Sequence, residues 1–432
     1  MREARVWRAL MGLENTVVED VVFDEDAAVM VVHVRPTASR RRRCGTCKRR
    51  SPGFDQGAGR RRWRALDLGT VQAFVEADAP RVTCRTHGVT VASVPWARHD
   101  AGHTHAFDDT VAWLATVTSK TATTRLMRVA WRTVGSIITR VWADTGGAVD
   151  RLENVTRIGV DEISYRRGMA YLTVVVDHDT GRLLWAAEGR DRATLRSFFD
   201  LLGETRSAGI THVSADGADW IAMVIDERCP NAVLCADPFH VVRWATDALD
   251  AVRRQAWNTA RAAARHEPSR SRGRQPADAP ARPASAHAHG LKGARYALWK
   301  NPENLTDRQQ VKLAWIAMTD PRVYRAYLLK EGLRVVFQLP YDQAVEALDR
   351  WLAWARRCRI EPFVKLARSI TKYRPSILAA IEHGLSNGLI ESVNTKIRLI
   401  TRIAFGFRSI PALIALMMLS LGGHRPALPG RN

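Results

Sequence analysis

The sequence predicts a mixed α/β protein that carries a mostly helical insertion. Two pairs of metal-ligating residues lie within the first 90 positions, and helical spacing of apolar residues follows them. From about residue 157 onward, short β-branched runs alternate with amphipathic stretches. The chain of 432 residues is long enough for two to four domains, and its 46% hydrophobic content is that of globular proteins.

The charge is strongly positive. The chain has 65 Lys and Arg against 44 Asp and Glu, a net charge of +21, which favours a polyanionic partner over a small metabolite. Eleven of these cations, but only one acid, lie between Arg40 and Arg64. Trp63 favours a folded unit here over a disordered basic tail or a localisation signal. We therefore expect contacts with DNA phosphates from a set of arginines. They are Arg41, Arg42, Arg43, Arg61, Arg62 and Arg64.

No segment resembles a secretory leader, and the longest apolar stretch, 411–421, is too short to span a bilayer. Six cysteines in 432 residues do not make a disulfide framework. The expectation is a soluble protein of the cytoplasm that is not bound to a membrane.

Two knuckles indicate a zinc ribbon in the basic region. Cys44 and Cys47 form a C-x2-C pair, and Cys84 and His87 form a C-x2-H pair. Four such ligands suit one tetrahedral Zn²⁺, which would be structural because no coordination position stays open. The intervening segment, including 71–76, can form a hairpin, whereas the three remaining cysteines are expected in the core.

A helix-turn-helix is expected next. Helical spacing begins at Asp108, a short helix starts near Ser119, and a third runs over 131–142. Such a unit suits reading of the DNA major groove, although a plain three-helix packing element stays possible. The residues that we expect to touch DNA here are Lys120, Arg132 and Arg140.

After the helix-turn-helix, the sequence predicts strands followed by alternating helices and strands. Strands are expected at 158–160, 171–176, 183–187, 211–215 and 232–236, with a hairpin turn at 177–181 and helices at 192–202 and 220–229. Three antiparallel strands followed by alternating units are the order of an RNase H-like core.

Acids fall at the ends of these strands. Asp161 is expected at the end of the first strand and Asp216 at the end of the fourth, which are neighbours in such a core. Carboxylates that face one another repel, and Mg²⁺ or Mn²⁺ removes the conflict while activating an oxygen for phosphodiester displacement. Glu162 points to the opposite face of its strand, so we exclude it as a direct ligand.

A late helix can supply a third carboxylate. Glu391, Asn394 and Arg398 share one helix face, and Lys396 and Arg402 extend the positive surface available to DNA. Between the two parts of the core, residues 261–290 contain no large apolar residue and predict a disordered linker. The chain then turns helical, with a capping box at 306–309.

These motifs together resemble the ISL3-type insertion-sequence transposases over nearly the whole chain. The resemblance is carried by both knuckles, by Ser119-Lys-Thr-Ala122 with Trp131-x2-Val134, by Gly159-Val-Asp161-Glu162, by Asp237-Pro-Phe-His240, by Ser386-Asn-Gly388-x2-Glu391-x2-Asn394 and by Arg402-Ile-Ala-Phe-Gly-Phe-Arg408.

The resemblance implies a DDE transposase that cuts the ends of its element and joins the freed 3′-hydroxyl to target DNA. It makes Asp161 the first acid and Glu391 the last. The middle acid stays open between two residues: strand order favours Asp216, while Asp237 lies in the best-marked motif. We favour Asp216, with Asp237, His240 and Asn394 as supporting residues.

The expected domains are a zinc-ribbon domain at 1–100, a helix-turn-helix at 101–150, a core at 151–255 and 376–432, and a linker with helical insertion at 256–375. The expected partners are double-stranded DNA, both element ends and target, and further copies of the chain at the bacterial nucleoid. Two alternatives remain: a regulator derived from a transposase that has lost catalysis, and a nuclease that cuts without joining.

Overall fold

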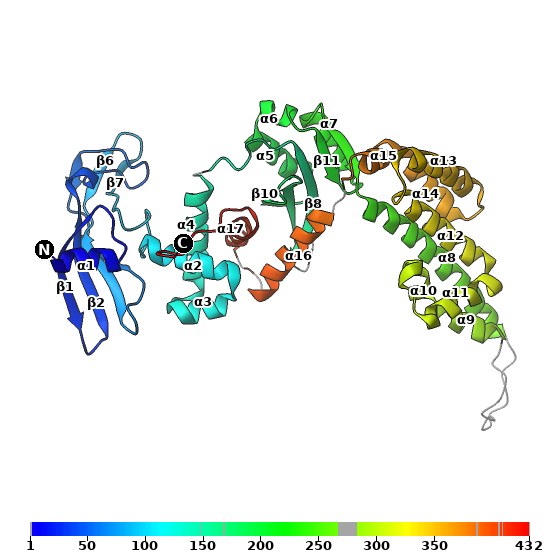
Figure 1. The fold of residues 1–432 in the computed structure, drawn as a ribbon, viewed down its shortest axis with the longest axis horizontal. Helices are drawn as coiled ribbons and strands as arrows, with labels where there is room; N and C mark the ends of the chain where they lie inside the picture. Colours follow the sequence, from blue (N-terminus) through cyan, green and yellow to red (C-terminus); the bar gives the residue numbers. More distant parts are fainter. Residues whose placement is uncertain are drawn as a thin grey trace, which may run out of the picture.

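The computed structural model describes residues 2–147, 149–166, 168, 170–266, 283–385, 388–404, 407 and 409–431. Its parts follow one another along the long axis of the molecule (Figure 1). The N-terminal strands lie at one end, the short helices and the main sheet in the middle, and the helical insertion at the other end. The described residues contain no helix that is long and apolar enough to cross a membrane.

Two small sheets build the N-terminal region. Helix α1 (Arg2–Leu10) precedes a sheet of order β1-β2-β5-β4, and the second sheet has the order β3-β6-β7. The strands are β1 (Thr16–Asp24), β2 (Val29–Pro36), β3 (Gly53–Asp55), β4 (Arg60–Arg64), β5 (Gln72–Asp78), β6 (Arg81–Cys84) and β7 (Gly88–Val91). The hairpin expected around 71–76 exists as β4–β5, but it belongs to the first sheet rather than to a knuckle. Buried Trp63 and Trp96 pack edge to face, 5.5 Å apart, in the core of this region.

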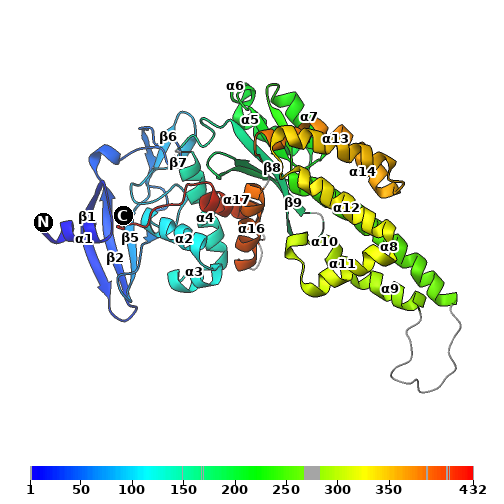
Figure 2. The same cartoon turned by 45° about the vertical axis from the view of Figure 1, so that its right-hand side comes forward.

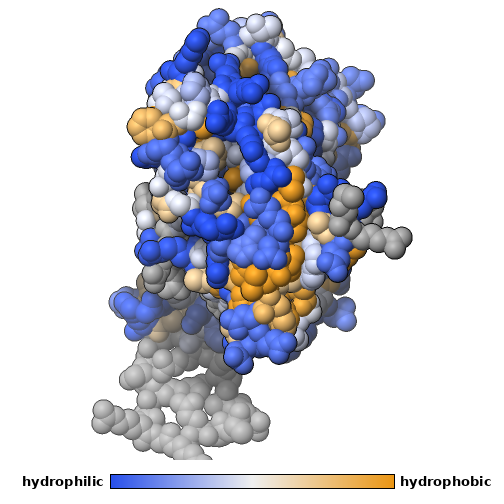
Figure 3. Space-filling model, turned by 90° about the vertical axis from the view of Figure 1, so that its left-hand side faces the viewer, coloured by the Kyte–Doolittle hydropathy of each residue, from blue (hydrophilic) through white to orange (hydrophobic). Residues whose placement is uncertain are grey.

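The edge of the first sheet is partly apolar. Strand β1 has no partner strand on its outer side in the described chain, and it exposes Val22 and Phe23. Seen from this end, the surface is largely hydrophilic, with one apolar strip (Figure 3).

The expected trio of helices is present. It consists of α2 (His105–Val117), α3 (Lys120–Met127) and α4 (Trp131–Gly146). Ser119 caps α3 by accepting a hydrogen bond from the Ala122 N–H. Helix α17 (Ile410–Leu421), from the far end of the chain, shares a buried cluster with this trio, so the C-terminus ties the helices to the main sheet.

The main sheet has the order β10-β9-β8-β11-β12. Its strands are β8 (Arg157–Arg166), β9 (Ala170–Asp177), β10 (Leu183–Glu188), β11 (His212–Ala215) and β12 (Val233–Ala236). The first three are antiparallel, and β11 and β12 run parallel to β8, in the order that the sequence predicts.

One expectation about this sheet is wrong. Asp161 does not end its strand, because β8 continues to Arg166 by pairing with the long β9. The parallel neighbour β11 does stop at Ala215, so Asp161 lies where β8 loses its partner on that side.

Helices cover both faces of the sheet (Figures 1 and 2). Helices α5 (Arg192–Leu202) and α7 (Asp219–Arg228) pack on one face, with the short α6 (Glu204–Ala208) between them in sequence. Helix α16 (Gly388–Ile403) and α17 pack on the other. Gly159 of β8 lets α16 approach, since a Cβ atom there would overlap with Ile390.

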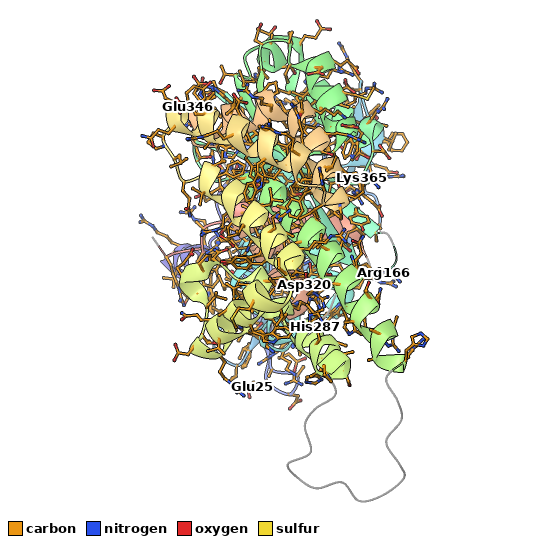
Figure 4. All side chains as sticks on the ribbon, turned by 90° about the vertical axis from the view of Figure 1, so that its right-hand side faces the viewer. Glu25, Arg166, His287, Asp320, Glu346 and Lys365 are labelled. Carbon is orange, nitrogen blue, oxygen red and sulfur yellow. The ribbon has the colours of Figure 1, made fainter. Side chains whose placement is uncertain are left out.

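A helical arm, which contains the expected insertion, begins directly after Asp237. It comprises α8 (Pro238–His266), α9 (Pro283–Gly293), α10 (Arg295–Trp299), α11 (Asp307–Thr319), α12 (Pro321–Val336), α13 (Tyr341–Arg357), α14 (Glu361–Lys372) and α15 (Arg374–Glu382). The capping box at the start of α11 is confirmed. Glu346 and Lys365 mark the outer helices α13 and α14 (Figure 4).

The prediction of a disordered linker at 261–290 is wrong at both ends of that range. Residues up to His266 continue α8, and residues from Pro283 form α9. Alanine is a strong helix former, and buried Ala260 and Ala288 let helices pack closely without large side chains. Residues 267–282 lie outside the described chain.

Candidate active site and DNA-binding surfaces

Three aspartates lie in one row across the parallel strands. Ala215 of β11 pairs with Val160 of β8 on one side and with Ala236 of β12 on the other. Each of these residues is followed by an aspartate. The three are Asp161, Asp216 and Asp237. The strand register therefore puts Asp216 between the other two.

The environment of Asp161 opposes its ionisation. Burial raises the pKa of Asp161 to about 6, and the charges of Asp216 and Asp237 add to the rise. The backbone N–H of Glu162 and the nearby His240 act in the opposite direction. A carboxylate in this position gains from any cation that approaches the row.

Asp237 is already fully engaged. Its side chain is 1% exposed, and it accepts hydrogen bonds from His240 Nδ1 at 2.6 Å and from the backbone N–H groups of Phe239 and His240 at 3.2 and 3.4 Å. These bonds cap the first turn of α8. The pKa of His240 is raised, chiefly by its hydrogen bond to Asp237.

Asp216 is more available. It is half-buried, and its Oδ1 accepts one bond of 3.2 Å from the Ala218 N–H. Of the two candidates for the middle acid, Asp216 thus has the carboxylate with fewer protein partners among the described residues.

Helix α16 crosses this end of the sheet. Asn394 is 3% exposed, and its Nδ2 donates a 2.7 Å hydrogen bond to Asp161 Oδ2. The Asn394 Oδ1 is buried and has no hydrogen-bond partner within the described residues. Glu391, one turn earlier, is half-exposed in the first turn of α16. Ser386 and Asn387 of the same motif lie outside the described residues.

Among the described residues, the candidate catalytic carboxylates do not form a closed metal cage. Among the described residues, only one set of three or more ligand atoms lies within 4.8 Å of one another, and it is in the N-terminal region. The carboxylates of Asp161, Asp216 and Glu391 do not form a set with oxygen atoms this close together.

The tight set is the one expected from the two knuckles. Cys47 Sγ lies 3.7 Å from Cys84 Sγ, and His87 Nδ1 lies 3.7 Å from Cys44 Sγ and 3.6 Å from Cys84 Sγ. A tetrahedral zinc with Zn–S bonds of about 2.3 Å separates its sulfur ligands by about 3.8 Å, so the geometry suits the ion. The pKa of Cys84 is lowered to about 6, first by the backbone N–H of Thr86, which favours the thiolate that zinc requires.

The arginines expected to contact DNA differ in how strongly other protein groups already hold them. Arg64 pairs with Asp67 and lies over the rings of Phe74 and Phe107, with its side chain 11% exposed, so it contributes to packing. Arg62 pairs with Glu76 at 2.5 Å. Arg61 donates to the Ala101 carbonyl at 2.8 Å.

The first arginine cluster is held by main-chain carbonyls. Arg43 donates to the carbonyls of Ser39 and Lys48, and exposed Arg41 donates to that of Pro36. Arg42 is exposed as well. Arg41 and Arg42 are therefore the more accessible members of the cluster.

The cationic side chains of the helix-turn-helix also include both exposed members and members that are paired within the protein. Arg132 is exposed on α4, whereas Arg140 forms a two-point ion pair with fully buried Asp108, at 2.9 and 3.2 Å. Burial lowers the pKa of Lys120, whose Nζ lies 4.8 Å from the centre of the Trp131 ring. On α16, Lys396, Arg398 and Arg402 are exposed.

A groove runs beside the exposed face of α4. Its volume is about 1220 Å³, and it is lined by Arg132, Ser136 and Thr139 of α4, by Arg166 at the end of β8, and by residues near the start of α17. The helix expected to read DNA thus borders the sheet that carries the aspartates.

Comparison with known proteins gives the family. A model of a transposase domain matches residues 158–417, a model of the helix-turn-helix domain of transposase family ISL3 matches residues 92–142, and a zinc-finger model of the transposases of IS204, IS1001, IS1096 and IS1165 matches residues 40–87. The chain belongs to the ISL3 family of transposases.

Relatives that align over nearly their whole length support the same family. The transposase for insertion sequence element IS1557 of Mycobacterium tuberculosis is 64% identical over 437 aligned positions, which cover 100% of this chain and 98% of the relative. The transposase for insertion sequence element IS1001 of Bordetella parapertussis is 25% identical over 412 positions, covering 94% of this chain and 96% of that protein. The resemblance noted in the sequence is confirmed, and the protein is a DNA-binding transposase.

The structure adds an ion pair between a buried acid and a half-exposed arginine on the other face of the transposase sheet. Glu162, whose side chain is 6% exposed, pairs with Arg190, and Arg190 lies over the ring of Tyr171. Burial raises the pKa of Glu162 to about 7. Glu162 lies on the face of the sheet that packs against α7. This position agrees with the alternation of side chains along a strand, on which the exclusion of Glu162 as a direct ligand rested.

The sequence also gave no sign that the insertion supports the Asp216 loop. Tyr373 Oη lies 3.1 Å from the Gly217 carbonyl and 2.6 Å from Asp219 Oδ1, and Lys372 Nζ donates to the same Asp219 oxygen at 2.6 Å. A Cβ atom on Gly217 would come within 2.6 Å of the Trp244 ring. Lys372 and Tyr373 lie more than 150 positions from Asp219 and Gly217 in the chain, so no local pattern could reveal these contacts.

Removing the tyrosine hydroxyl tests this support. Tyr373→Phe is expected to slow DNA cleavage by about 10-fold, the lower end of the range for groups that support a metal ligand from outside, because its hydroxyl holds Gly217 and Asp219 of the loop that carries Asp216, the expected ligand. DNA binding should be unchanged in an electrophoretic shift assay. Tyr296→Phe, which alters a 63% exposed tyrosine of the same insertion, is the matched control. Equal cleavage rates for both variants would contradict the supporting role.

Proposed function

We propose that this ISL3 transposase cuts DNA at the ends of its element and joins the freed 3′-hydroxyls to target DNA, with Asp161, Asp216 and Glu391 as the acidic triad. The observation that carries the proposal is the position of Asp161 and Asp216 side by side on neighbouring parallel strands, with α16 across their ends. The order of three antiparallel strands followed by two parallel ones supports an RNase H-like core.

The donor set suits a hard divalent cation. Aspartate and glutamate oxygens are the ligands that Mg²⁺ and Mn²⁺ prefer, and the buried Asn394 Oδ1 adds an oxygen without a hydrogen-bond partner among the described residues. Such an ion, held by Asp161, Asp216 and Glu391, would activate the attacking oxygen and neutralise the leaving oxygen.

The protein's own groups prepare the site. Asn394 fixes the carboxylate of Asp161 through its 2.7 Å bond, and Asp237 orients His240 through its 2.6 Å bond. When His240 is protonated, its charge favours the ionised form of Asp161. In each transfer, the attacking hydroxyl loses its proton as its oxygen bonds to phosphorus, and the 3′-oxygen of the cut strand leaves.

The remaining parts would recognise DNA. We propose a structural Zn²⁺ at Cys44, Cys47, Cys84 and His87, phosphate contacts by Arg41 and Arg42, and base contacts by the exposed face of α4 with Arg132. Lys396, Arg398 and Arg402 would hold DNA across α16.

We propose four functional parts, with 1–100 and 101–150 as DNA-binding domains and 256–375 inserted into a core of 151–255 and 376–432. Helix α8 runs through position 255 and α15 through position 375, so continuous helices join core and insertion. Since two element ends must be cut together, we propose a homo-oligomer that acts at the cytoplasmic nucleoid.

Cleavage and strand transfer of a labelled element end test the proposal. With Mg²⁺ or Mn²⁺ the protein should nick the end and then join it to a target plasmid, and without divalent metal it should only bind. Binding without cutting in either metal would favour an inactive regulator, and cutting without joining would favour a nuclease.

A further inference from the structure

An aromatic side chain stands exposed beside the row of aspartates. Phe239 is the second residue of α8, lies between Asp237 and His240 in sequence, and is 58% exposed. Its ring centre lies 5.9 Å from that of His240, edge on to it. The acid row thus has a free phenyl face at its rim.

Packing of the fold does not account for this ring. Phe239 belongs to none of the buried clusters found in the described residues, whereas Val241, two residues on, is 1% exposed and anchors α8. Single exposed apolar residues are ordinary on protein surfaces. Phe239 differs because it lies between Asp237 and His240 in sequence, and both of these act on Asp161 of the candidate active site.

A cation shares the face of the helix with the ring. Arg243 follows Phe239 by four positions, so the two lie on one side of α8, and both are exposed. No acid pairs with Arg243 in the described chain. An aromatic face next to a free arginine is the combination that binds single-stranded nucleic acid, since bases stack on the ring and phosphates meet the cation.

We propose that Phe239 stacks on a nucleobase next to the scissile phosphate, with Arg243 on the adjoining phosphate. The proposal rests on the proposed active site at Asp161 and Asp216. A base in an intact duplex hides its face against its neighbours, so the stack requires one nucleotide at the cut to leave the duplex. Phe239 would hold that nucleotide out and keep the scissile bond beside the carboxylates.

The first experiment does not depend on catalysis. The full-length protein is bound, in Ca²⁺ to block cutting, to element ends that carry 2-aminopurine at each of the two nucleotides on either side of the cut. At one position the fluorescence should rise with wild type, be quenched with Phe239→Trp, because a stacked indole quenches 2-aminopurine, and stay at the duplex value with Phe239→Ala or Phe239→Leu. A rise of equal size in the alanine variant would overturn the proposal.

The second experiment measures cutting. Phe239→Ala should cut the intact duplex about 5- to 150-fold more slowly, the range expected for one lost base stack. An abasic nucleotide at the responsive position should let both proteins cut at the same rate, because no base then needs to be held. Leu201→Ala, an equally exposed apolar residue on α5 at 51%, should behave as wild type.

The outcomes are distinct. If the abasic substrate leaves the deficit of Phe239→Ala unchanged, the ring acts on the protein and the stacking proposal fails. If wild type never cuts but the 2-aminopurine signal still requires an aromatic residue at 239, the proposed catalysis fails and the stacking site stands. Thermal melting of each variant shows whether it is folded, and Phe239→Trp supplies the test should alanine unfold α8.

Discussion

Replacing Asp216 with asparagine is expected to slow DNA cleavage by about 1,000-fold or more. A neutral amide holds a divalent cation far less well than a carboxylate does, and the cation's contribution of several kcal/mol to the transition state corresponds to this factor. Binding of the element end should survive, because Asp216 adds a negative charge and no contact to phosphate. The measurement is single-turnover cleavage of a labelled end in Mg²⁺, with a shift assay on the same DNA.

The matched variant is Asp237→Asn. Asp237 is buried and is used by His240 and by the first turn of α8, so we expect a smaller loss, of about 10- to 100-fold. The amide oxygen can still accept bonds from the backbone. Should Asp237→Asn be inactive while Asp216→Asn cuts normally, the middle ligand is Asp237 and the proposed assignment is wrong.

Removal of zinc is expected to weaken specific DNA binding while the core stays folded. Four ligands hold together segments 40 positions apart, and a structural zinc supplies the folding free energy of so small a unit. Cys84→Ser, or treatment with a zinc chelator, should release one zinc per chain and weaken binding of the element end by about 10-fold or more, as the arginines lose their positions. Zinc content by atomic absorption and affinity by fluorescence anisotropy, both without Mg²⁺, are the measurements.

The control is a cysteine outside the cluster. Cys229 is 2% exposed, and burial raises its pKa to about 12, so it is an apolar core residue. Cys229→Ala should keep both the zinc and the DNA affinity, at some cost in thermal stability. A protein purified without zinc that still binds its DNA tightly would contradict the structural role.

Several secondary-structure elements and candidate ligands of this protein could be predicted from local sequence patterns. Helix α5 spans Arg192–Leu202 as expected, since the apolar residues of one face repeat with helical period and Asp191 caps its start. The knuckle ligands were found because metal sites use few residue types at short spacing. Both features depend on neighbours in sequence, and that is where sequence patterns carry information.

The errors come from interactions that are distant in sequence. Strand β8 extends past Asp161 because β9 pairs with it, and 261–266 is helical because α8 continues into the packed arm. Arg140 carries the charge expected of a DNA contact, but Asp108, 32 positions earlier, already pairs with it. Charge can be counted in a sequence, whereas its neutralisation depends on which residues meet.

The sequence by itself determined the family, the order of the strands, the four residues of the Cys3His cluster and the candidate acids, because each depends on short motifs or on hydrophobic periodicity. Only the tertiary structure aligned Asp161, Asp216 and Asp237 in one row, bonded Asn394 to Asp161 and brought Tyr373 to the Asp216 loop. Those contacts join residues from 21 positions apart, as for Ala215 and Ala236, to 233 positions apart, as for Asp161 and Asn394. They arise from strand register and helix packing, which the whole chain sets together and no local segment encodes.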